Sequence, residues 1–201
     1  MLVLLDNGHG VETAGKRSPK WQDGTQLFEY KYAREIAVLV QKALEERGIE
    51  CIRVVTEQTD VPLNERCKRV NRICADVGAS NCLLVSIHCN AAGNTGKPMT
   101  ARGWSVFVGL NASEKSKFLA TAFAQCAEKV GLKVRNYSPA QRYWAQNLAM
   151  CRDTKCPAVL TENLFMDNEQ DCKLLLSEEG KQKIVATHVE AIVAYIQYMN
   201  K

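Results

Sequence analysis

The stretch LLDNGHG, residues 4–10, ends an apolar run on a histidine that lies between two glycines. Residues 1–5 are apolar enough to form a buried strand, and the Asn7-Gly8 pair that follows is a turn signal. The chain has three histidines, and the other two are His88 and His188. A scarce imidazole on a glycine turn at the mouth of a strand is therefore a candidate functional group.

The rest of the chain continues this alternation of apolar runs and amphipathic stretches. The predicted strands are residues 2–6, 50–55, 82–88, 103–109, 149–152 and 158–162. The predicted helices are residues 28–47, 62–77, 113–130 and 178–198. Alternating strands and helices indicate an α/β fold. We expect a single domain over residues 1–201, with a largely parallel or mixed sheet of about six strands and helices on both faces.

Composition excludes several classes of function. No apolar stretch approaches the roughly 20 residues that span a bilayer, so we expect no membrane span. Residues 1–5 lack a basic flank and end at Asp6, so no signal peptide is visible and synthesis in the cytoplasm is expected. The net charge is only +4 and the basic residues are scattered, which argues against a nucleic-acid partner.

Nine cysteines are many for a chain of this length, and their number is odd. No C-x-x-C pair occurs, so neither a zinc finger nor a disulfide framework is indicated. Cys67 and Cys74 lie on one apolar stripe of a predicted helix. We expect the cysteines to be small buried hydrophobic residues with free thiols, as in a protein made in a reducing cytosol.

Two long connections have no periodicity, residues 11–27 and residues 136–147. Loops of this length in a compact domain are uncommon and often functional. The alternative, equally weighted, is a passive surface loop anchored by Trp21 or Trp144.

Candidate site residues lie where predicted strands end. His9 follows the first strand, His88 closes the run LLVSIH, and Glu162 closes the run AVLTE. Parallel strands bring such ends to one edge of the sheet, where α/β proteins bind ligands. Two neutral imidazoles favour a divalent metal, zinc above all, with an acidic third ligand, for which Glu29 is the best candidate. His188 falls in the last predicted helix and is expected to be a surface or packing residue.

Six motifs in sequence order resemble one enzyme family over essentially the whole chain. They are DNGHG, FEYKYAREIA, LNERCKRVN, SIHCNA, RGWSVFV and PAVLTENLFMDN. In this order they are similar to the zinc-dependent N-acetylmuramoyl-L-alanine amidases of the amidase type 3 family. The resemblance implies one zinc ion per chain, bound by His9, Glu29 and His88, with Glu162 as the catalytic carboxylate. It also implies peptidoglycan as the substrate, cleaved between N-acetylmuramic acid and the L-alanine of the stem peptide.

The chain departs from the family pattern at two positions. The family commonly has a second glycine after GHG, where this chain has Val11, and often a glycine where this chain has Leu164. Neither departure removes a ligand. The short form of the chain, with GKRSP in its first loop, resembles phage-encoded members, the endolysins, more than exported autolysins.

The chemistry of these residues supports the same assignment. Two imidazoles and a carboxylate leave zinc a fourth position for water, and a further glutamate can move protons to the leaving amine. A zinc peptidase would use the same ligands, and a non-catalytic wall-binding module is the alternative from another class. A cysteine hydrolase using Cys89 and His88 is disfavoured, because adjacent strand residues point to opposite faces.

Some members of the family carry an inserted helix that covers the zinc until an activator binds. Here the corresponding residues, 89–103, hold two glycines before Pro98 and no helical stripe. We therefore expect an open site that needs no protein activator, in a monomer that acts on the cell wall.

Overall fold

The computed structural model describes residues 1–94 and 96–200. Its six strands form one mixed sheet in the order β2-β1-β3-β6-β4-β5. Strand β4 is antiparallel to β6, β5 runs parallel to β4, and the other neighbouring pairs are parallel. The strands are β1 (Leu2–Asn7), β2 (Cys51–Arg53), β3 (Cys82–Asn90), β4 (Ser105–Gly109), β5 (Trp144–Gln146) and β6 (Ala158–Phe165).

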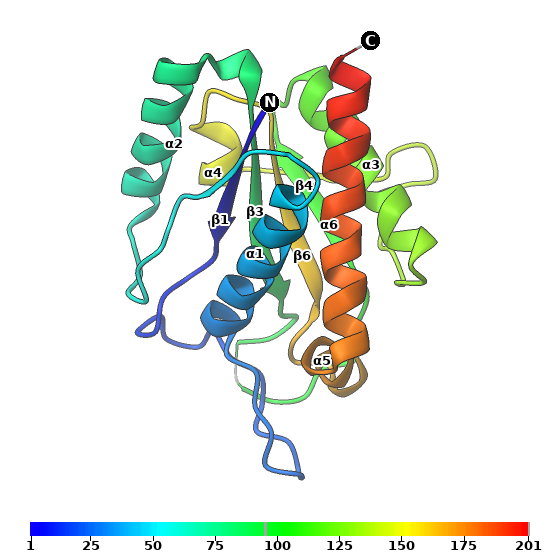
Figure 1. The fold of residues 1–201 in the computed structure, drawn as a ribbon. Helices are drawn as coiled ribbons and strands as arrows, with labels where there is room; N and C mark the ends of the chain where they lie inside the picture. Colours follow the sequence, from blue (N-terminus) through cyan, green and yellow to red (C-terminus); the bar gives the residue numbers. More distant parts are fainter. Residues whose placement is uncertain (95, 201) are drawn as a thin grey trace.

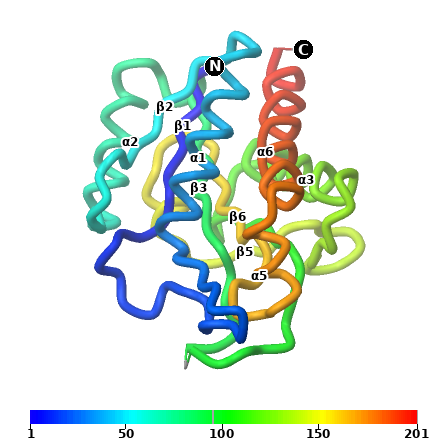
Figure 2. Tube along the Cα trace, turned by 60° about the horizontal axis from the view of Figure 1, so that its bottom comes forward, coloured from blue at the N-terminus to red at the C-terminus, as the bar shows by residue number. Residues whose placement is uncertain are grey.

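Helices cover both faces of the sheet, as expected (Figures 1 and 2). One face packs against α1 (Glu29–Glu45), α3 (Glu114–Lys129), α5 (Glu169–Leu176) and α6 (Glu178–Met199), and the other against α2 (Leu63–Val77) and α4 (Ala149–Arg152). A 3₁₀ turn, η1 (Ala79–Asn81), leads into β3. Strand β1 is buried on both sides, with Val3 and Leu5 in one core and Leu2 and Leu4 in the other. This explains its continuous apolar run.

Three elements differ from the sequence-based expectation. Residues 149–152 form the short helix α4 and not a strand, because Met150 packs its sulfur against Cys67 of α2, 3.7 Å away. The missing sixth strand is β5, which lies in the predicted loop 136–147 and is an edge strand too short and too exposed to show alternation. Helix α5 was not predicted, although the side chain of Asn168 caps it by accepting from the N–H of Asp171.

The carboxyl ends of β1, β3 and β6 meet at one edge of the sheet, at the bottom of Figure 1. Strands β3 and β6 continue past their predicted ends, and their register shifts between His88 and Asn90. Two long segments lie beneath this edge, one between β1 and α1 and one between β3 and β4 (Figure 1). Among the described residues of the second segment no helix is found.

The segment of residues 11–27 is anchored on α5. Trp21 is buried, and its indole N–H donates to the sulfur of Cys172 at 3.2 Å. The hydroxyl of Ser18 accepts from the N–H of Leu27 at 2.9 Å, which ties the two arms of the loop together. Trp21 thus anchors this loop, as one of the two alternatives from the sequence predicted. None of the described helices is long and apolar enough to cross a membrane.

Candidate active site

His9 lies two residues after β1 on a strained turn, with a φ of 61°. The flanking glycines explain why the turn can form. A Cβ on Gly8 would come within 2.3 Å of the His88 ring, and one on Gly10 within 2.0 Å of the backbone nitrogen of Asp60. Real Cβ atoms do not make such contacts, so both positions require glycine. The GHG triplet therefore places one imidazole against another.

Two arginines hold the carbonyl groups of this turn. Arg66 of α2 is 2% exposed and donates to the carbonyl of Asn7 at 2.6 Å and to that of His9 at 3.3 Å. Arg34 of α1 donates to the carbonyl of Gly8 at 3.4 Å. Neither arginine was predicted as a site residue, although both lie within the sequence motifs FEYKYAREIA and LNERCKRVN. A basic residue on the buried side of an amphipathic helix is the signal that could have identified them.

A buried carboxylate balances the charge of Arg66. Asp6 is 1% exposed, and its Oδ1 accepts from Nη1 of Arg66 at 2.8 Å. Its second oxygen accepts from the hydroxyl of Ser86 on β3 at 2.5 Å. Asp60 accepts from the other guanidinium nitrogen at 3.1 Å. The network satisfies both buried charges, which a buried ion pair needs in order to hold a fixed geometry.

Glu29 brings the two strand-end histidines together from the first turn of α1. Its Oε1 lies 3.1 Å from Nδ1 of His88 and 3.4 Å from Nε2 of His9. The same oxygen accepts from the N–H of Cys89 at 3.1 Å, which fixes the carboxylate against β3. The two rings are perpendicular with centroids 5.0 Å apart. The three expected metal ligands therefore converge on one point, with their ligand atoms within 4.8 Å of one another.

The donor set fits a divalent metal. Burial opposes ionisation of Glu29, but the hydrogen bonds and charges of His88 and His9 outweigh it and hold the pKa of Glu29 far below its ordinary value. Burial likewise lowers the pKa of His88, and the hydrogen bond and charge of Glu29 more than compensate, so this pKa is raised. The other oxygen of Glu29 is buried and has no hydrogen-bond partner among the described residues. An ionised carboxylate with a spare oxygen beside two imidazoles is the donor chemistry that zinc prefers.

Glu162 lies beside His88 on the neighbouring strand. The two residues are partners in the parallel register of β3 and β6, so their side chains leave the same face of the sheet. Oε2 of Glu162 is shielded from solvent and has no hydrogen-bond partner among the described residues. Burial raises the pKa of this carboxyl group to about 7, although the charge of His88 partly opposes the shift. A group with such a pKa can exchange a proton near neutral pH.

A hydrogen-bonded chain supports His88 from behind. Asn163 donates to the carbonyl of His88 at 3.0 Å and to the hydroxyl of Thr161 at 3.2 Å, and it accepts from the indole of Trp104 at 2.8 Å. Thr161 in turn lies 3.0 Å from Nε2 of His188. These side chains fix the end of β3 from the core side.

His188 is a packing residue, and it is completely buried. Its other ring nitrogen, Nδ1, lies 2.8 Å from the carbonyl of Ile184. Burial lowers the pKa of His188 to about 4, so the ring is neutral. We expect His188→Ala to lower the stability of the fold, because the change would leave a hole in the core and remove the contact with Thr161.

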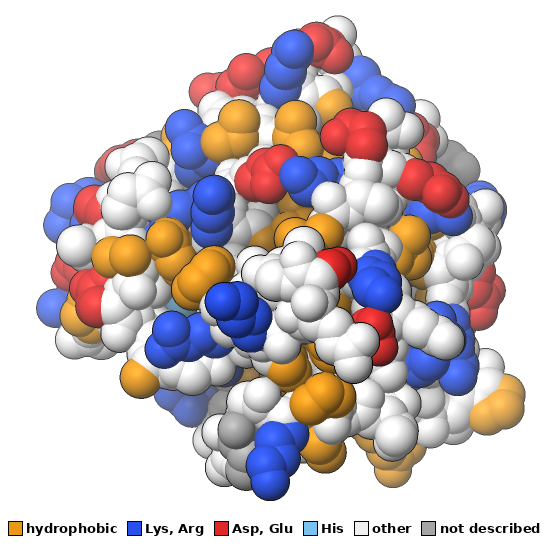
Figure 3. All heavy atoms as spheres, turned by 90° about the horizontal axis from the view of Figure 1, so that it is seen from below, with side chains coloured by type: hydrophobic (Ala, Val, Ile, Leu, Met, Phe, Trp, Pro, Cys, Tyr) orange, Lys and Arg blue, Asp and Glu red, His pale blue; other side chains and the backbone are white. Residues whose placement is uncertain are grey.

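Two cavities flank the converging residues at this edge of the sheet, which Figure 3 views from below. One, of about 440 Å³, includes His9, His88, Asp60 and Leu63 in its lining. The other, of about 290 Å³, lies on the far side of β3 and has Glu162 in its wall. The side chains of His9 and His88 are 18% and 16% exposed. A substrate can therefore reach both the imidazoles and Glu162.

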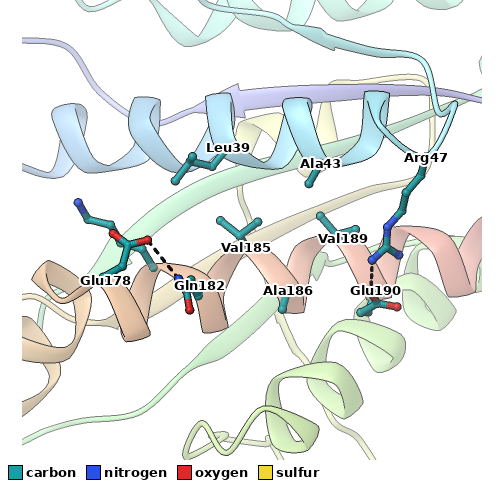
Figure 4. A pocket seen from close by; sticks show the side chains of 10 residues that line it. Leu39, Ala43, Arg47, Glu178, Gln182, Val185, Ala186, Val189 and Glu190 are labelled. Atoms are coloured by element: carbon teal, nitrogen blue, oxygen red, sulfur yellow. Dashed lines mark hydrogen bonds and ion pairs between the residues drawn. The ribbon is translucent and has the colours of Figure 1, made fainter.

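The groove between α1 and α6 does not share this chemistry (Figure 4). Its floor is apolar, formed by Leu39, Val185 and Val189 among others, and an ion pair between Arg47 and Glu190 at 2.6 Å closes one end. Leu39 is ten residues from the site residue at the start of α1, or about 15 Å along the helix. The groove is therefore separate from the candidate site.

The cysteine-hydrolase alternative does not fit the structure. Cys89 is 3% exposed and packs into the core on the α1 face, whereas His88 faces the cavity. Burial raises the pKa of the Cys89 thiol well above its ordinary value. A neutral thiol that points away from the imidazole cannot act as a nucleophile with it.

An α/β fold with two imidazoles and a carboxylate that could hold a metal ion, and a second, protonatable carboxylate, at the carboxyl edge of its sheet is typical of a hydrolase. Comparison with known proteins specifies which one. Residues 3–194 match the family model described as N-acetylmuramoyl-L-alanine amidase, so the chain belongs to that family. The expected enzyme class, an amide hydrolase that acts on peptidoglycan, is thereby confirmed.

Individual relatives agree with this membership. The endolysin of Bacillus phage SPP1 is 30% identical over 202 residues, which is 100% of this chain and 68% of that protein. The amidase CwlM of Bacillus licheniformis is 26% identical over 94% of this chain and 66% of its own length. The chain thus spans about two thirds of these relatives. The crystal structure of an N-acetylmuramoyl-L-alanine amidase from Clostridium difficile 630 has the same fold, with a TM-score of 0.79, 23% identity, and 98% and 96% of the two chains covered.

The structure explains one departure from the family pattern. Leu164 has a φ of 64°, in the left-handed region that favours glycine, and its side chain is 2% exposed. A side chain in this region costs about 1–2 kcal/mol, which the burial of a leucine offsets. Val11, the other departure, is 56% exposed and lies at the surface.

Proposed function

We propose that the chain binds one zinc ion through His9, Glu29 and His88 and hydrolyses the amide bond between N-acetylmuramic acid and L-alanine of the stem peptide. The observation that carries the proposal is the convergence of the three ligand atoms beside a shielded carboxylate whose pKa is about 7. Zinc, when bound, supplies a Lewis acid that activates water and polarises the scissile carbonyl.

The chain itself supplies orientation and proton transfer. Glu29 keeps a negative charge at the centre of the site because the imidazoles hold its pKa low. Glu162 lies on the adjacent strand and is the general base that accepts a proton from the attacking water. It then donates this proton to the nitrogen of L-alanine, because an amine leaves far more readily than its anion. Arg66 and Arg34 form an arginine clamp on the carbonyl groups of residues 7–9 and keep His9 aimed at the same point throughout.

The setting of the site supports action without a protein activator. Both histidine rings keep contact with solvent, and the described residues between β3 and β4 contain no helix that could lie over them. We infer a monomeric enzyme that degrades exposed cell wall, with a phage endolysin as its nearest functional analogue among the relatives named above.

Mass spectrometry of muropeptides after digestion tests the proposal. Sacculi are incubated with the zinc-loaded protein, with protein treated with a chelator, and with chelated protein to which zinc is restored. We expect free stem peptides that begin with L-alanine and intact glycan strands, lost on chelation and recovered with zinc. Cleavage between two amino acids would instead identify a zinc peptidase. Binding to sacculi without any released peptide would identify a wall-binding module.

A further inference from the structure

The cavity beside Glu162 has the composition of a peptide subsite. It occupies about 290 Å³ between the ends of β6, β4 and β5. Glu162 lies in its wall together with Arg135, the amides of Asn90 and Gln146, and the ring of Trp144. Its volume is at the small end for ligand sites, which suits one or two amino-acid residues better than a disaccharide.

The order of strands determines which half of the substrate enters this cavity. Across the sheet edge, the ligand histidines follow β1 and lie on β3, Glu162 is on β6, and the cavity extends over β4 toward β5. In the proposed reaction Glu162 delivers its proton to the amine that leaves. The peptide attached to that amine therefore continues past Glu162, away from the histidines and into this cavity. This step rests on the proposed function.

Arg135 is held in place by its surroundings. Its N–H donates to the carbonyl of Trp104 at 2.8 Å, and its carbonyl accepts from the indole of Trp144 at 2.8 Å. Its guanidinium lies 4.9 Å from the centre of the Phe165 ring. Gly103 leaves room for the arginine stem, because a Cβ there would lie 3.1 Å from Cγ of Arg135. The first two contacts fix the backbone of Arg135. The Phe165 ring and a hydrogen bond from Nη1 of Arg135 to the carbonyl of Arg102 at 3.5 Å restrict the side chain, so the guanidinium is preorganised for a ligand.

The positive charge of Arg135 has no carboxylate partner among the described residues. No carboxylate of the described residues lies within ion-pair distance of its guanidinium, whereas Arg66 and Arg102 each pair with a buried aspartate. The other charged group in the cavity wall is Glu162, and the two are not paired. A guanidinium presents a planar fork of donors that matches a carboxylate.

We propose that Arg135 binds a carboxylate of the stem peptide and makes the enzyme selective for peptides that carry that charge. Two carboxylates of the stem peptide could pair with a guanidinium in this way. One is the α-carboxylate of a γ-linked glutamate after L-alanine, and the other is the carboxylate at the peptide end. The first is closer to the scissile bond and is the one we assign, because the cavity adjoins Glu162 directly.

The experiment compares three muramyl tripeptides as substrates. One has both carboxylates free, the second has a carboxamide at the γ-linked residue, and the third has a carboxamide at the peptide end. For the zinc-loaded wild-type enzyme we expect kcat/KM to fall about tenfold for the second substrate, mainly through KM, and little for the third. Arg135→Gln removes this preference, so the ratio between the first two substrates approaches one.

Lys133→Gln is the matched control, because it removes an exposed positive charge two residues away and retains the preference. Arg135→Lys keeps the charge without the fork and restores part of the preference. If the wild-type enzyme does not distinguish the first two substrates, or if Arg135→Gln still does, the assignment is wrong. A fall in kcat/KM for the third substrate alone would mean that Arg135 binds the carboxylate at the peptide end, and it would also overturn the assignment. Failure of the wild-type enzyme to cleave any of the three would instead contradict the proposed function.

Discussion

Two carboxylates at the same edge of the sheet have opposite proton affinities. Burial raises the pKa of both Glu29, at the start of α1, and Glu162, near the end of β6. Glu29 lies against two imidazoles, which reverse the effect and keep it ionised. Glu162 has no such hydrogen bonds to the described residues, and its pKa stays at about 7. The comparison teaches that the neighbours, and not burial, decide which carboxylate holds a cation and which one exchanges protons.

The sharpest test of this division is Glu162→Gln. The amide keeps the shape of the side chain but cannot accept a proton from water, so we expect turnover to fall by about 10²–10⁴. Zinc content, measured by elemental analysis, should not change. Cys89→Ser serves as a control and should remain active. Digestion of cell walls by Glu162→Gln at close to the wild-type rate would show that Glu162 is structural.

Glu29→Gln should give the complementary result. Removal of the charge that both imidazoles face weakens zinc binding, and we expect the dissociation constant to rise more than about 100-fold, because even residues that only orient ligands cost about 10–100-fold. Competition with a chromogenic chelator measures this constant. His9→Ala and His88→Ala should lose zinc and activity together. Retention of zinc by both histidine variants would contradict the ligand assignment.

His188 extends the comparison to a buried imidazole without a carboxylate. Its pKa is about 4 in the folded protein and about 6.5 in the unfolded chain. The unfolded state binds more protons between these values, so the contribution of His188 to stability is complete above pH 6.5 and is lost as the pH falls toward 4. The loss amounts to about 3 kcal/mol.

Urea denaturation of the wild type and of His188→Asn at pH 7 and pH 4.5 isolates this contribution. We expect the stability difference between the two proteins to shrink at the lower pH, while zinc content and turnover at pH 7 stay close to wild type. An unchanged difference would mean that the His188 ring is protonated in the folded protein.

The smallest effect is expected for the arginine clamp. Arg66→Lys keeps a positive charge near Asp6 but cannot reach the carbonyls of Asn7 and His9 together. The turn that carries His9 should loosen, and we expect zinc affinity to fall about tenfold. Arg69→Lys is the matched control, because Arg69 is on the same helix but pairs with Glu57 at the surface. Equal zinc affinities in the two variants would show that the clamp does not position His9.

The periodicity of apolar residues predicted the long elements, in which a regular pattern marks the buried side. Strand β1 and helix α2 are of this kind, since a continuous apolar run or a single stripe determines which side is buried. Helix α4 and strand β5 are too short to show a period in their sequences. Their secondary structure depends on packing against residues that are distant in the chain. The spacing of apolar residues therefore predicted the secondary structure of the long elements and not that of the short ones.

The site was predictable to the extent that its residues close strands. His9, His88 and Glu162 could be selected because each follows or ends an apolar run. Glu29 could be named as the best acidic candidate, and the family resemblance then assigned it as a ligand. Arg135 could not be found in this way. It lies in an irregular segment, and its role depends on a cavity that strands distant in sequence enclose.

The nine thiols make unfolding of the protein irreversible under oxidising conditions. All are free in the structure, and eight of them are buried. While the fold is intact, oxidants reach them poorly. Once the chain unfolds in an oxidising medium such as the outside of a cell, an odd number of cysteines can form many wrong pairings and no complete set. Its working life at the wall is then governed by the rate of unfolding and not by the free energy of unfolding.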